Sequence, residues 1–104
     1  MAKSMILWHA NPSAPWPMDP AQGDKMNELI FGGIDNALKA GAFLEFGFFP
    51  EGASGYAIFS GDPKDAFKQS MLLWPFIEME VHEIVPYETG KEIALKVQAE
   101  AMKR

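Results

Sequence analysis

Cysteine is absent from this chain of 104 residues, which excludes disulfide bonds, thiolate metal sites and cysteine nucleophiles. Basic residues are few: nine Lys and Arg stand against 14 Asp and Glu, for a net charge of −5. Phosphate backbones and anionic lipid surfaces are bound by clustered Lys and Arg, so we expect neither a nucleic-acid partner nor a membrane partner. No apolar run is long enough to span a bilayer, and MAKSMILWHANP is too weakly hydrophobic for a secretory signal. A cytoplasmic location is therefore expected.

A glycine-rich phosphate loop is also lacking, because GFFPEGASG does not have the required spacing. The chain is instead rich in apolar side chains, with eight Phe and three Trp and a hydrophobic fraction of 48%. So many aromatic residues in a single domain predict an aromatic core, or an apolar surface reserved for a ligand or partner.

Hydrophobic periodicity predicts four strands, at residues 4–10, 42–49, 55–60 and within 72–86. Asp-Pro pairs predict helix starts at Asp19-Pro20 and Asp62-Pro63, and Gly41 predicts the end of the first helix. A capping box at Thr89 to Glu92 predicts the start of a third helix. The order is that of an α+β, ferredoxin-like β-α-β-β-α-β domain, an antiparallel sheet with both main helices on one face. We predict a single domain over residues 1–104, with a core at 4–86 and a C-terminal helical tail at 87–104.

Two features of this plan lead to further expectations. Gly32-Gly33 inside the first helix costs about 1 kcal/mol per glycine relative to Ala, and we expect a close approach to the sheet to compensate. Simple alternation places Leu44, Phe46 and Phe48 on one face of their strand and Phe43 on the other. A bare sheet face rich in Phe and Leu should be covered, most economically by the same face of a second copy.

Three segments resemble muconolactone delta-isomerase and its relatives in the dimeric α/β-barrel superfamily. Residues 6–9 (ILWH) look like the aromatic-His end of that family's first strand, and 18–21 (MDPA) open the first helix as they do there. Residues 75–81 (PFIEMEV) are similar to its final strand, whereas the proline loop, the second strand and the tail depart from the pattern. The resemblance implies a homodimer without a cofactor that isomerises a small unsaturated lactone or carbonyl compound. The superfamily also contains monooxygenases.

Three residues are candidates for catalysis. Isomerisation removes a proton next to a carbonyl and returns it elsewhere, which requires groups that titrate near neutral pH. The first and last strands are neighbours in the predicted sheet, so His9 should lie near Glu78, with Glu80 two residues further on. Alternatively, His9 bonds a backbone carbonyl, and the two carboxylates only discourage aggregation of an edge strand.

Five residues are candidates for contacts with an apolar or aromatic-derived ligand: Trp8, Trp16, Glu45, Tyr56 and His82. Trp16, on a loop with four prolines, could close over a ligand or dock against the protein itself. Tyr56 could donate to a ligand carbonyl, and Trp8 and His82 also fit packing and interface roles. No metal site is expected, because the spacing of the His and carboxylate residues supports none. The alternatives to an isomerase are a non-catalytic ligand-binding or assembly protein and a cofactor-free monooxygenase.

Overall fold

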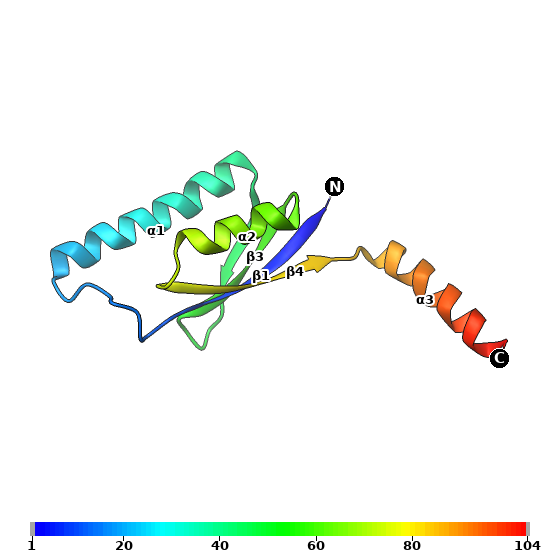
Figure 1. Cartoon of the computed structure of the whole chain (residues 1–104). Helices are drawn as coiled ribbons and strands as arrows, with labels where there is room; N and C mark the ends of the chain where they lie inside the picture. Colours follow the sequence, from blue (N-terminus) through cyan, green and yellow to red (C-terminus); the bar gives the residue numbers. More distant parts are fainter. Residues whose placement is uncertain (1, 104) are drawn as a thin grey trace.

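A four-stranded antiparallel sheet forms the centre of the protein, in a computed structural model that describes residues 2–103 (Figure 1). The strands follow the order β2-β3-β1-β4 and are all paired antiparallel. This α+β arrangement is compatible with the predicted ferredoxin-like plan. The elements, in chain order, are β1 (Lys3–Ala10), α1 (Pro20–Ala40), β2 (Phe43–Phe48), β3 (Ser54–Ser60), α2 (Pro63–Leu72), β4 (Ile77–Ile84) and α3 (Tyr87–Met102).

The predicted starts of α1 and α2 and the predicted end of α1 are confirmed. Both helices begin at the proline of an Asp-Pro pair, and the Asp62 carboxylate accepts a hydrogen bond from the Lys64 backbone N–H at 2.8 Å. Helix α1 ends at Gly41, whose φ of 80° lies in the left-handed region that glycine adopts without strain. Helix α3 begins at Tyr87, directly after Pro86, so the start predicted from the capping box lies too late in the chain.

A β-bulge in β2 makes the simple alternation wrong. The pairing with β3 shifts between Phe43 and Glu45, so one residue is added to the strand there. As a result Phe43, Phe46 and Phe48 all lie on the face that the helices cover. The open face is therefore not rich in Phe and Leu. It carries a small apolar group in which Met5 and Leu7 of β1 lie opposite Ile58 and Tyr56 of β3, with polar residues around it, and Met5 is 36% exposed there.

The hydrophobic core lies between the sheet and the helices, and it consists of Ile6, Phe43, Ala57, Phe59 and Ala66. Helix α2 packs on β4 and β1, whereas α1 contacts mainly β2 and contributes no buried residue. The expected close approach of the α1 glycines to the sheet is wrong. A Cβ built at Gly32 or Gly33 would have no neighbour within 4 Å outside the helix, so α1 stands off from the sheet.

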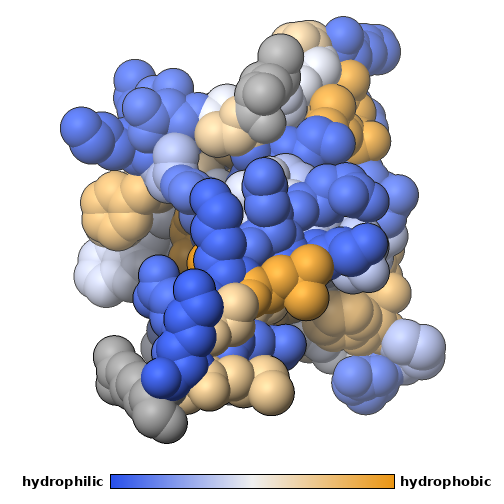
Figure 2. All heavy atoms as spheres, turned by 90° about the vertical axis from the view of Figure 1, so that its right-hand side faces the viewer, coloured by the Kyte–Doolittle hydropathy of each residue, from blue (hydrophilic) through white to orange (hydrophobic). Residues whose placement is uncertain are grey.

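Helix α3 leads away from the sheet, and the molecule is elongated, with extents of 66 × 29 × 25 Å (Figure 1). None of its described residues is buried, and Ile93 and Val97 are more than half exposed. Figure 2, which views the side from which α3 protrudes, shows hydrophobic patches between hydrophilic residues. Within residues 2–103, no helix is both long enough and apolar enough to cross a membrane.

Candidate functional site

The predicted site residues lie on two opposite faces of the sheet. Neighbouring residues of a strand point to opposite sides, so Trp8 faces the helices and His9 faces outward. Trp8 is 7% exposed, while the His9 side chain is 53% exposed. Trp8 and Trp16 belong to the face that the helices cover. The other candidates lie on the open face: His9, Glu45, Tyr56, Glu78, Glu80 and His82.

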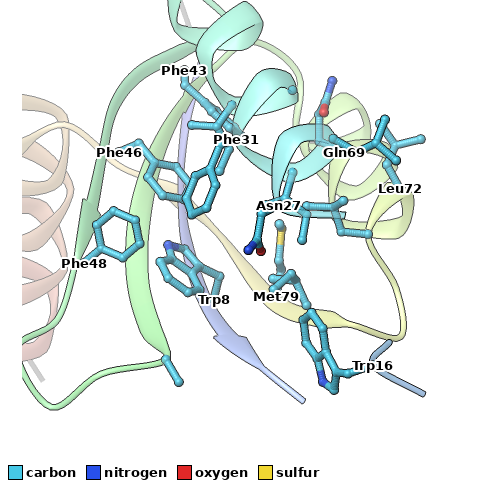
Figure 3. A pocket seen from close by; sticks show the side chains of 17 residues that line it. Trp8, Trp16, Asn27, Phe31, Phe43, Phe46, Phe48, Gln69, Leu72 and Met79 are labelled. Carbon is cyan, nitrogen blue, oxygen red and sulfur yellow. The ribbon is translucent and has the colours of Figure 1, made fainter. Parts of the chain in front are cut away.

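A cavity of about 450 Å³ lies between the sheet and the two main helices (Figure 3). The sheet contributes aromatic and thioether side chains to its wall, and α1 contributes the face that carries Asn27, Phe31 and Ile34. The volume falls within the range of about 300–1,000 Å³ that is typical of small-molecule sites. It exists because α1 stands off from the strands that it covers.

Trp8 forms the aromatic wall of this cavity with two phenylalanines of β2. Its ring stacks on Phe46 with centroids 5.5 Å apart and meets the edge of Phe48 at 5.4 Å. Gly55 of β3 makes this position possible. A Cβ there would lie 2.5 Å from Cζ2 of the Trp8 ring and would also collide with the Gly47 carbonyl oxygen. The glycine therefore allows the indole to lie directly over the strand.

The two tryptophans of the cavity differ in their hydrogen bonds. Trp16 comes from the proline-rich loop, packs its ring against Phe76 at 5.0 Å, and donates from Nε1 to the Asn11 carbonyl oxygen at 2.6 Å. The Nε1 atom of Trp8 is buried and has no hydrogen-bond partner in the part of the chain that the structure describes. The cavity wall therefore contains a donor that the described residues leave unused.

Three polar pairs occupy the open face. His9 lies opposite Glu78 in the β1–β4 register, and His9 Nε2 is 3.5 Å from Glu78 Oε1. Glu80 does not approach His9. Its Oε2 lies 3.2 Å from Nε2 of His82, two residues further along β4.

The third pair joins β3 and β2. The Tyr56 hydroxyl donates to the Glu45 carboxylate, and this hydrogen bond raises the pKa of Tyr56 above its usual value. Partial desolvation of the phenol and repulsion between a phenolate and the Glu45 carboxylate raise this pKa further.

The two faces therefore differ in their possible chemistry. The covered face offers an apolar molecule a cavity with a mainly apolar lining. The open face brings acid and base groups together, but it does not exclude water in the single chain, and exposed His–Glu pairs contribute little to stability. Among residues 2–103, no group of three His, Asp or Glu side chains is arranged to hold a metal ion.

Sequence reasoning missed the cavity residues of the helices. Asn27, Ile30, Phe31 and Ile34 follow helical spacing on α1, and Gln69 extends the lining from α2. Ile30 and Ile34 fitted the expected apolar stripe of a core-facing helix. The one sequence feature that could have indicated a cavity is Asn27, a polar residue among apolar residues whose spacing is typical of a core-facing helix.

Comparison of the chain with protein-family models, with curated proteins and with solved structures finds no match in any of the three. Functional inference for this protein therefore depends on the geometry of the cavity and of the open face.

Proposed function

We propose that this protein binds a small apolar or aromatic-derived molecule in the cavity between the sheet and the helices. The observation that carries the proposal is the cavity itself, about 450 Å³ of space whose sheet side includes Trp8, Phe46, Phe48 and Met79 (Figure 3). Apolar surface moved from water into such a site contributes about 25 cal/mol per Å². Stacking on the aromatic wall adds orientation to this non-directional driving force.

Filling the cavity from α1 tests the binding function. Gly33 lines the cavity and Gly23 does not, and a Cβ at either position has no neighbour within 4 Å outside the helix. Both Gly→Leu substitutions should strengthen the helix by up to about 1 kcal/mol. Only Gly33→Leu should lower the affinity for aromatic ketones and lactones, measured by ligand-observed NMR. Equal affinities in the two variants would place binding outside the cavity.

The second candidate function is acid–base isomerisation of a small unsaturated lactone or carbonyl compound. The observation that favours it is the His9–Glu78 pair, with Nε2 and Oε1 3.5 Å apart. In this proposal one of these groups, acting as the base, removes a proton next to the carbonyl, and the other, which is protonated at the start, delivers a proton to a different carbon. Proton transfer between the two groups, whose atoms lie 3.5 Å apart, then restores their starting states. The resemblance of residues 6–9 and 75–81 to the muconolactone isomerase family supports the same assignment.

This reaction requires that water be excluded from the open face, and we propose that a second copy covers it in a dimeric barrel. Met5, Leu7, Ile58 and Ile84 lie on this face between the polar pairs and supply apolar area for such a contact. Light scattering at micromolar concentrations should then give the mass of a dimer. A monomeric mass over this range would remove the dimer and, with it, the enclosed acid–base site.

Proton exchange at carbon tests the isomerase candidate directly. We would incubate the protein with butenolides in heavy water and follow deuterium incorporation by NMR. Loss of general acid–base catalysis in His9→Ala should slow incorporation about 10²- to 10⁴-fold while ligand affinity is kept. Binding without incorporation would identify a non-catalytic binding protein, and oxygen uptake with a reduced aromatic substrate would indicate a monooxygenase instead.

A further inference from the structure

The indole N–H of Trp8 is a buried donor at the wall of the cavity. The Trp8 side chain is more than nine-tenths buried, and its Nε1 has no acceptor among residues 2–103. Buried polar groups nearly always have a hydrogen-bond partner, and an unpaired donor destabilises the protein. Trp16 shows the usual outcome within the same cavity, since its Nε1 donates to the Asn11 carbonyl oxygen. Ser4 Oγ is also buried without a hydrogen-bond partner among the described residues, but Ser4 does not line the cavity, so Trp8 is the residue whose unused donor lies at a possible ligand site.

The cavity also carries no charge. Its polar side chains, within the described part of the chain, are the carboxamides of Asn27 and Gln69 and the tryptophan N–H groups. A carboxylate or phosphate enclosed there would lack a cationic partner, and an unpaired buried charge is strongly unfavourable. A cationic ligand would similarly lack a carboxylate. These absences favour an uncharged ligand.

We propose that the cavity binds an uncharged, flat, mainly apolar molecule whose carbonyl oxygen accepts the hydrogen bond of Trp8 Nε1. This inference rests on the proposed binding function and specifies the class of ligand. Figure 3 shows Trp8, Met79 and the Asn27 carboxamide around the same space, so Asn27 offers a second polar contact from α1. Nε1 is buried in the structure, so the proposal requires that a neighbouring ring shift to let the ligand oxygen reach it. Phe48 is the candidate, because it contacts the Trp8 ring and is 63% exposed.

Three probes built on the same bicyclic frame separate the parts of this inference. Indane has the apolar frame alone, 1-indanone adds a carbonyl oxygen, and indane-1-carboxylate adds a charge. A neutral hydrogen bond should make 1-indanone bind about two- to tenfold more tightly than indane. Indane-1-carboxylate should bind at least about tenfold more weakly than 1-indanone, because its charge is unpaired.

The hydrogen bond itself can be observed in the ¹⁵N-labelled protein. The chain contains three tryptophans, and Trp16→Phe and Trp74→Phe identify the Trp8 indole signal by elimination. This signal should move downfield with 1-indanone and change far less with indane. In Trp8→Phe, which keeps an aromatic ring but removes the donor, the two neutral probes should bind equally. The shift of the Trp8 indole signal is measured in the wild-type protein and does not depend on the Trp8→Phe variant.

The outcomes distinguish this inference from the proposed function. Equal binding of indane and 1-indanone with an unmoved Trp8 signal would overturn the ligand class and leave the apolar cavity as a binding site. Tightest binding of the carboxylate would overturn the requirement for an uncharged ligand. If none of the three probes binds, the proposed function and this inference both fail.

Discussion

The two faces of the sheet differ in what they can do, although adjacent residues of the same strands build both. On the face toward the helices, Trp8 is nearly buried and borders an apolar cavity. On the open face, His9 and its partner Glu78 are about half exposed. The sheet therefore separates the apolar cavity from the His9–Glu78 pair within one chain. A single molecule cannot lie in the cavity and also touch the His9–Glu78 pair, so catalysis by that pair requires a second enclosed space on the open face.

The largest expected difference between the faces is in stability, and neighbouring residues of β1 give a matched test. Ile6 is fully buried in the core, whereas Leu7 is only partly covered and lies on the open face. We expect Ile6→Ala to lower the free energy of unfolding by about 2–5 kcal/mol, because it removes buried contacts and leaves a cavity. Leu7→Ala should cost about 1 kcal/mol or less in the single chain. Urea unfolding monitored by circular dichroism measures both values.

Protein concentration makes this test sharper. If a second copy covers the open face, the cost of Leu7→Ala should approach that of Ile6→Ala and should depend on protein concentration. Equal, concentration-independent costs in a monomeric protein would contradict the difference between the two faces.

A second matched pair of substitutions uses Gly55 and Gly47. Each glycine makes room for an aromatic ring, and the two rings lie on opposite faces of the sheet. Gly55→Ala places a methyl group against both the Trp8 ring and the Gly47 backbone, and neither of these can move away from it on its own. We expect a loss of about 1–3 kcal/mol in unfolding free energy and weaker ligand binding, since the indole is pushed from the cavity wall. The nearest atoms to a Cβ at Gly47 belong to the Tyr56 side chain, which lies on the open face and can rotate, so the cost of Gly47→Ala should be smaller and ligand binding should persist. Near-ultraviolet circular dichroism reports the displaced Trp8. Equal effects on ligand binding would contradict the assignment of the site to the covered face.

The sequence was informative where a local rule decides the structure. The backbone preferences of Pro20 and Gly41 alone determine where α1 begins and ends. The expectation that the first and last strands are neighbours was enough to predict that His9 lies near Glu78. The bulge at Phe43 depends on pairing with β3, which no local rule contains. The cavity depends on how far α1 stands from the sheet. That distance follows from tertiary packing, and the apolar stripe of α1 reads the same whether it lines a core or a cavity.

Helix α3 gives a smaller effect that tests whether another copy covers this helix. An isolated helix of 16 residues is only marginally stable in water, and α3 buries none of its described residues. We expect its amides to exchange with deuterium within seconds to minutes, whereas those of β1 remain protected because the strand lies between β3 and β4. Slow exchange in α3 that is lost on dilution would show instead that another copy covers this helix.

The smallest expected effect is the titration of Tyr56, which reports the electrostatics of the open face. Its pKa is raised by the hydrogen bond to Glu45, so Glu45→Gln should lower it toward the usual value of about 10. Absorbance of the phenolate measures this shift in a Tyr87→Phe background, in which Tyr56 is the one remaining tyrosine. Because the folded-state pKa is raised, the stabilisation from this pair is complete below the unfolded pKa and is lost as pH rises through the folded pKa. The stability of the wild-type protein should therefore fall as pH rises through this range, and Tyr56→Phe should remove this part of the pH dependence. An unchanged Tyr56 titration in Glu45→Gln would mean that the pair does not form in solution, and the open face would then lack one of its three polar pairs.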